Sequence, residues 1–191
     1  MSKGRLEAFS DGVIAIIITI MVLEMKAPHG DRVDDLLPLI PTFLSYILSF
    51  AYIGIYWNNH HHLLHTCNVV TGAMLWANLH LLFWLSLLPF ATGWMGENHF
   101  ATAPTVLYGA VLLMAAVAYY LLERVIMRAQ GQDSILKQAI GGDWKGRVSV
   151  VLYLVAIVVA LYSPRIADAV FVAAALLWLI PDRRIEKRLA K

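Results

Sequence analysis

The chain has 191 residues, of which 60% are hydrophobic and only 15% are charged, and its mean hydropathy is +0.67. Soluble domains are typically about half apolar and about a quarter charged, so this composition indicates an integral membrane protein. The formal net charge of +2 is too small to indicate a nucleic-acid partner, and the single cysteine excludes an internal disulfide bond and a thiolate metal site.

Six apolar stretches follow one another along the chain, and each approaches the length needed to cross a bilayer. A helix needs about 20 mostly apolar residues to span the hydrocarbon core. The predicted spans are residues 6–25, 36–64, 69–95, 105–127, 148–162 and 166–180. The last two are short, so tilt or local thinning of the bilayer must accommodate them. We therefore expect one all-α transmembrane domain over residues 1–191, with six helices and no soluble portion.

Prolines stand where the ends and bends of these spans are expected. Pro38 and Pro41 lie in the first turns of the second span, where a missing N–H group costs least. Pro89 predicts a kink in the third span. Pro164 and Pro181 follow the fifth and sixth spans and are expected to end them.

The first stretch has a competing interpretation as a secretory signal peptide. Lys3 and Arg5 would form its basic region and residues 13–23 its apolar region. Asp11, however, interrupts the start of the stretch, and Glu24-Met25-Lys26 stands where small residues should precede a cleavage site. The sequence therefore favours a retained transmembrane helix.

The distribution of basic residues predicts how the six spans are oriented. An even number of spans places both ends of the domain on one side of the membrane. The basic residues on that side are Lys3, Arg5, Arg124, Arg128, Lys137, Lys145, Arg147, Arg183, Arg184, Lys187, Arg188 and Lys191. The other side has only Lys26, Arg32 and Arg165. Because Lys and Arg are enriched in cytoplasmic loops, we expect cytoplasmic termini and a multi-pass protein of the cell (plasma or inner) membrane.

The first span carries a carboxylate beside an apolar stripe. An ionisable residue inside a span indicates a functional site, because exposing it to lipid is costly. On a helical wheel of about 100° per residue, Ile16, Ile20 and Leu23 fall within about 60° of one another. Asp11 lies about 140° from Ile16 and Ser10 about 120° from it on the other side. Spacing alone favours a stripe that faces lipid and an Asp11 that is buried within its own subunit.

The second span ends in the sequence YWNNHHHLLH, whose histidines are His60, His61, His62 and His65. His61 and His65 are four residues apart on a helix and could chelate one metal ion. Membrane di-iron enzymes, however, combine several such histidine boxes, and here only His80 lies in another span near this level. A hydrogen-bonded layer between helices is the favoured interpretation, so we expect no structural metal and no cofactor.

The third span places Asn78 and His80 at membrane depth, where both side chains need partners. The candidate partners are Arg5, Ser10, Asp11 and the histidines of the second span, and simple attachment between helices is the alternative. The sequence contains no GxSxG, P-loop, HExxH or dinucleotide motif, so we expect no enzyme activity.

The segment RLEAFSD, residues 5–11, has the pattern RxxxFSD, which resembles the first-span signature of the transmembrane protein 175 family of potassium channels. The segments YWNNHH and NLHLLFWLSLLPFATGWM in the second and third spans are similar to that family too. Spans four to six resemble it only in number and length. One six-span unit resembles the prokaryotic form, which implies a homotetramer with a central pore lined by the first span.

The resemblance also implies roles for the first-span residues. The family has no TVGYG filter, and its pore is narrowed by apolar rings whose positions match Ile16, Ile20 and Leu23. A pore-lining hydroxyl matches Thr19, so potassium ions are expected to pass near Ile16 and Thr19. The resemblance thus reverses the lipid-facing interpretation of the stripe. From the residues alone, the Thr19 hydroxyl could equally bond only to the Ala15 carbonyl of its own helix.

The same resemblance implies a polar network that ties the first span to its neighbours below the constriction. Its members are Arg5, Phe9, Ser10 and Asp11 of the motif, with His60, His61, Asn78 and His80 as partners. The expected function is a potassium-permeable cation channel that conducts passively, with its own copies, the lipid bilayer and potassium ions as partners. A proton-coupled transporter that uses Asp11 and the histidines, and a histidine-based metal or haem oxidoreductase, are the alternatives.

Overall fold

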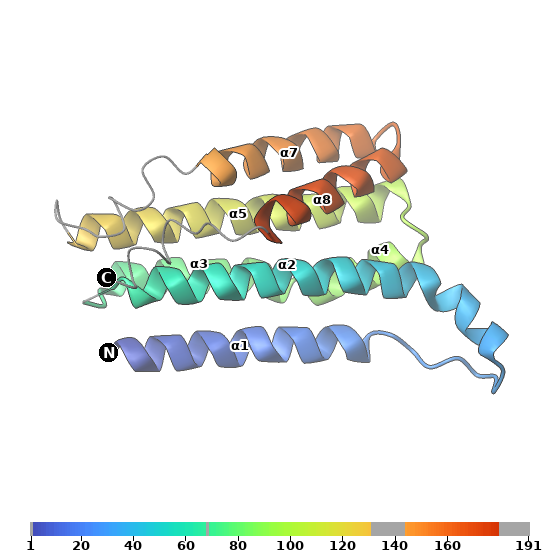
Figure 1. The fold of residues 1–191 in the computed structure, drawn as a ribbon, viewed down its shortest axis with the longest axis horizontal. Helices are drawn as coiled ribbons and strands as arrows, with labels where there is room; N and C mark the ends of the chain where they lie inside the picture. The colour runs from blue at the N-terminus through green and yellow to red at the C-terminus, as the bar shows by residue number, and fades with distance from the viewer. Residues whose placement is uncertain (1, 68, 131–143, 180–191) are drawn as a thin grey trace.

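The computed structural model describes residues 2–67, 69–130 and 144–179, and every regular element in these ranges is helical (Figure 1). The elements are α1 (Lys3–Leu23), the 3-10 helix η1 (Val33–Leu39), α2 (Ile40–His65), α3 (Gly72–Ser86), α4 (Leu88–Glu97), α5 (Thr102–Gln130), α7 (Trp144–Ala160) and α8 (Pro164–Leu179). Successive long helices run in opposite directions along the bundle (Figure 1).

The helices differ from the predicted spans most clearly in the second and third spans. The second span, residues 36–64, begins in η1, and α2 begins only at Ile40. The third, residues 69–95, is interrupted at Leu87, because Pro89 lies in the first turn of α4 and cannot continue the hydrogen bonding of α3. The sixth was expected to end at Ile180, which lies outside the described residues.

Four helical stretches in the described part of the chain are long and apolar enough to cross a membrane. They are α1, η1 with α2, α3 with α4, and α5. The two remaining helices, α7 and α8, have 17 and 16 residues. At about 1.5 Å per residue, these two are shorter than a hydrocarbon core of about 30 Å.

The bundle is layered, with α1 at one side and α7 and α8 at the other (Figure 1). α1 packs on α2, α3 and α4, and α5 packs on α3, α4 and α7. The apolar core between these layers includes Leu6 and Ile14 of α1, Leu81 of α3 and Leu112 of α5, none of them more than 2% exposed. One long face of α1 is left without a neighbour among the described helices.

Hydrogen bonds between small polar side chains connect α2, α4 and α5 inside the bundle. The Ser45 hydroxyl donates to the Thr92 carbonyl oxygen at 3.2 Å, and the Thr92 hydroxyl donates to Ser49 Oγ at 2.7 Å. Ser49 Oγ also lies 3.0 Å from the Tyr108 hydroxyl. Such bonds stabilise helix association where apolar burial contributes little, because the competing lipid is equally apolar.

A close approach of α4 to α2 gives the first prediction. A Cβ atom added at Gly96 would lie 2.5 Å from Thr42 Cα and 2.6 Å from Ser45 Oγ. Since backbone must then move, we expect Gly96→Ala to destabilise the protein by about 1–3 kcal/mol, measured as a lower melting temperature. Gly54→Ala in α2 is the control, because a Cβ there meets nothing within 4 Å. Equal melting temperatures for the two variants would show that the helices separate easily here.

Candidate functional site

α1 has one buried face and one exposed face. Leu6, Ser10, Ile14, Ile17 and Met21 recur at intervals of three or four residues and are all buried against the other helices. The apolar residues on the opposite side of α1 are largely uncovered: Phe9 is 50%, Ile16 57%, Ile20 40% and Leu23 77% exposed. The predicted stripe therefore lies on a face of the subunit that the described residues leave uncovered.

Thr19 lies on the same exposed face of α1. Its hydroxyl donates to the Ile16 carbonyl oxygen at 2.9 Å. The hydroxyl thus bonds within its own helix, as the alternative interpretation allowed, but its acceptor is the Ile16 carbonyl oxygen and not that of Ala15. A threonine hydroxyl that donates back to its own helix still has lone pairs that point outward and can accept or coordinate.

A buried chain of hydrogen bonds joins α1, α3 and α2. Asn78 Nδ2 donates to Ser10 Oγ at 2.9 Å, and Ser10 Oγ donates to the Leu6 carbonyl oxygen at 2.8 Å. Asn78 Oδ1 lies 2.7 Å from His60 Nε2. Since an amide oxygen only accepts, this arrangement requires a proton on His60 Nε2. Ser10 and Asn78 are fully buried and His60 is 2% exposed, so the three side chains satisfy one another away from water.

Asp11 is tied to α2 outside this chain of bonds. Trp57 Nε1 donates to Asp11 Oδ1 at 3.0 Å, and both side chains are exposed in the subunit. The expectation from spacing that Asp11 is buried is therefore wrong. The carboxylate lies at the edge of the exposed α1 face, where the indole of the neighbouring helix meets it. Trp57 was not among the predicted site residues, although it stands within the YWNNHH segment.

The remaining predicted residues lie apart from the Ser10–Asn78–His60 chain. His80 accepts a hydrogen bond from Trp84 Nε1 of its own helix at 3.0 Å. His61 is exposed, with its ring 6.5 Å from Trp57 and 6.2 Å from His65. Arg5 is exposed and makes no hydrogen bond or ion pair with any residue that the structure describes.

The histidines do not form a shared metal site in the described ranges. His60 points into the bundle toward Asn78, whereas His61 and His65 are exposed. No group of three or more His, Cys, Asp or Glu residues there is placed to hold a metal ion. Near the same end of the bundle, Lys3 Nζ donates to the His65 carbonyl oxygen at 2.8 Å and so joins the start of α1 to the end of α2.

Long apolar helices packed around a buried polar network define a multi-pass membrane protein. The family model for the endosomal/lysosomal potassium channel TMEM175 matches residues 5–89, which include most of α1 and the whole of α2 and α3. Potassium channel HX13_20290 of Chryseobacterium sp. strain P1-3 is 57% identical over 189 residues, which are 99% of this chain and 98% of that protein. The chain therefore belongs to the TMEM175 family, which confirms the family that the RxxxFSD motif predicted.

Two further relatives show how far the similarity extends. The human endosomal/lysosomal proton channel TMEM175 is 36% identical over 103 residues, which are 48% of this chain but 20% of that protein. The crystal structure of a lysosomal potassium-selective channel TMEM175 homolog from Chamaesiphon minutus superposes with a TM-score of 0.79 at 30% identity. It covers 94% of this chain and 97% of the other. The fold is thus shared along nearly the whole chain, and the relatives matched here are named as channels.

Proposed function

We propose that this chain forms a homotetrameric, potassium-permeable cation channel whose pore is lined by α1. The observation that carries the proposal is the uncovered apolar face of α1, with Ile16, Ile20 and Leu23 aligned along it. Four such faces around an axis would build successive apolar rings, and conduction would require the rings to widen enough to hold water. Thr19 would add a ring of hydroxyls next to Ile16, where a permeating ion could replace part of its hydration shell.

The proposed topology has six spans with both termini in the cytoplasm. Support comes from the position of the basic residues along the bundle. Two basic residues lie in each of three helix ends: the start of α1 (Lys3, Arg5), the last turns of α5 (Arg124, Arg128) and the start of α7 (Lys145, Arg147). These three helix ends point toward the end of the bundle where α1 begins (Figure 1), whereas Lys26 and Arg32, between α1 and η1, and Arg165, at the start of α8, belong to the opposite ends of their helices. This asymmetry is the one found between cytoplasmic and external loops. The short α7 and α8 would cross with local thinning of the bilayer.

The Ser10–Asn78–His60 chain is proposed to hold α1 in register with α2 and α3. A pore-lining helix without such attachment could rotate and turn the Ile16 face away from the axis. Arg5, Phe9 and Asp11 lie on the exposed side of α1 and are proposed to complete the attachment at or near the subunit boundary. Among the described residues, the ring of His61 lies near Trp57 and His80 bonds to Trp84, and neither histidine bonds to the Ser10–Asn78–His60 chain.

Ion flux measurements on purified protein in liposomes test the function. We expect passive potassium flux that follows the potassium gradient and needs no second substrate. Flux that appears only with an imposed proton gradient would instead support a coupled transporter. Empty liposomes and liposomes with the heat-denatured protein are the controls.

Asp11→Ala gives a prediction about assembly. Because the exposed Trp57–Asp11 bond is worth at most about 1 kcal/mol within the subunit, the isolated fold should barely be affected. We expect the tetramer or its function to be lost instead, since Asp11 borders the proposed subunit boundary. Size-exclusion chromatography with light scattering measures the assembly. Trp57→Phe, which removes the same hydrogen bond but keeps the carboxylate, is the matched control. A stable Asp11→Ala tetramer with altered ion selectivity would show that Asp11 faces the ions.

Cysteine labelling tests on which side of the membrane the N-terminus and the loop after α1 lie. The native Cys67 is 3% exposed, and burial raises the pKa of its thiol to about 11, so it should react slowly with maleimides at neutral pH. New cysteines at Ser2 and at Asp31 should therefore report their own accessibility. In sealed right-side-out vesicles we expect a membrane-impermeant maleimide to label Asp31→Cys and to label Ser2→Cys only after permeabilisation. The reverse order would contradict the proposed topology.

A further inference from the structure

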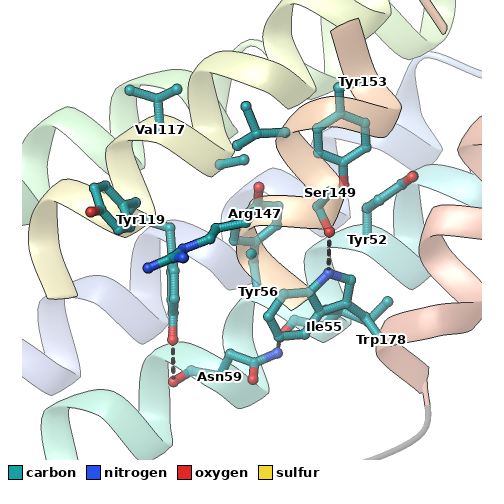
Figure 2. A pocket seen from close by; sticks show the side chains of 14 residues that line it. Tyr52, Ile55, Tyr56, Asn59, Val117, Tyr119, Arg147, Ser149, Tyr153 and Trp178 are labelled. Carbon is teal, nitrogen blue, oxygen red and sulfur yellow. Dashed lines mark hydrogen bonds between the residues drawn. The ribbon is translucent and has the colours of Figure 1, made fainter. Parts of the chain in front are cut away.

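A cavity lies on the side of the subunit away from α1. Its volume is about 400 Å³, within the range of pockets that hold small ligands. It is bounded by α2, α5, α7 and the end of α8, as Figure 2 shows. The described part of α8 ends at Leu179, near the middle of the bundle. In contrast, α2 and α5 extend further toward the end of the bundle at which α1 begins (Figure 1). The cavity occupies the space beside this last turn.

The walls of the cavity are mainly aromatic and aliphatic, and several of their polar atoms are already paired. The Tyr52 hydroxyl donates to the Phe171 carbonyl oxygen at 2.6 Å. Trp178 Nε1 donates to Ser149 Oγ at 2.7 Å, and the Tyr119 hydroxyl donates to the Asn59 carbonyl oxygen at 3.2 Å (Figure 2). With these groups satisfied inside the protein, the lining suits an apolar occupant better than a polar one.

A single exposed cation completes the site. Arg147 lies in the first turn of α7 and lines the cavity, and in Figure 2 its side chain extends away from α7 among the other lining side chains. Its guanidinium forms no ion pair or hydrogen bond with the described residues. A guanidinium binds phosphate through two parallel N–H donors, so an anionic group at this position would be held by geometry as well as by charge.

We propose that this cavity binds one acyl chain of an anionic phospholipid, whose phosphate headgroup contacts Arg147. An apolar cavity with one exposed basic residue in its wall, between helices of a membrane protein, matches the two-part chemistry of such a lipid. The proposal does not require that the protein conducts ions. It rests on the proposed topology only for the name of the leaflet, which would be the cytoplasmic one.

Native mass spectrometry of the purified full chain tests the proposal, with phosphatidylglycerol and phosphatidylcholine of identical acyl chains as probes. We expect one phosphatidylglycerol per subunit to be retained in preference to phosphatidylcholine. Arg147→Gln should weaken its binding about five- to tenfold. Arg128→Gln is the matched control, because Arg128 is also exposed at this end of the bundle but does not line the cavity. Soluble glycerol phosphate should not compete.

Filling the cavity provides an independent test. Ala116→Trp places an indole in the space and should reduce phosphatidylglycerol retention to the level of nonspecific binding. Val117→Phe is a milder second variant, used if Ala116→Trp does not fold as judged by its elution volume and melting temperature. Equal losses in Arg147→Gln and Arg128→Gln, or full retention in a folded cavity-filled variant, would overturn the proposal. Such results would mean nonspecific charge attraction or binding on the outer surface.

Discussion

Ile16→Asn is expected to raise single-channel potassium conductance about fivefold, which corresponds to lowering the barrier by about 1 kcal/mol. The physical reason is that, in the proposed tetramer, four asparagine side chains would offer hydrogen bonds to water where four isoleucines would exclude it. Ile16 is 57% exposed in the subunit, so the change removes little packing inside the fold. Currents from purified protein in planar bilayers measure the effect, and the sodium permeability recorded in the same experiment should rise as well.

Val22→Asn is the matched control for this prediction. Val22 is also exposed on α1, at 45%, but lies about 120° around the helix from Ile16. The Val22→Asn variant therefore adds the same polar group to α1 but directs it away from the axis of the proposed pore. Unchanged currents in Ile16→Asn, or equal increases in both variants, would show that the Ile16 face does not surround the ions.

Asn78→Leu is expected to destabilise the fold by about 2 kcal/mol, which for a chain of this size lowers the melting temperature by roughly 4–8 °C. Asn78 is fully buried and connects Ser10 of α1 to His60 of α2. Leucine has a similar size but neither donates nor accepts, so the His60 N–H group loses its acceptor inside the bundle. The melting temperature of purified protein measures the loss.

Two further variants distinguish the loss of the Ser10–Asn78–His60 hydrogen bonds from the general effect of replacing an asparagine by leucine. Asn59→Leu is the control, because among the described residues the Asn59 side chain donates only within its own helix, to the Ile55 carbonyl oxygen. The double variant His60→Leu with Asn78→Leu removes both partners of one bond and should cost little more than Asn78→Leu alone. Additive losses in the double variant would mean that the two side chains act independently.

The sequence alone was sufficient for the family and for most of the helix positions. Apolar segments of about 20 residues must form helices in a bilayer, because their backbone groups find no other partners there. Pro89 interrupts the third predicted span, as its lack of an N–H group requires. The RxxxFSD motif and the heptad-like spacing of Ile16, Ile20 and Leu23 placed that stripe on one side of α1, and the family match followed from the same residues.

Only the tertiary structure decided which polar groups meet. The sequence offered Arg5, Ser10, Asp11 and the histidines as partners for Asn78 without choosing among them, and the packing selects Ser10 and His60. The Trp57 indole donates a hydrogen bond to Asp11, and the Trp84 indole donates one to His80 of the same helix. These choices depend on the rotation and axial offset of each helix against its neighbours, to which distant core contacts all contribute. Hydrogen bonds act only over about 3 Å, so a pattern along one helix cannot specify them.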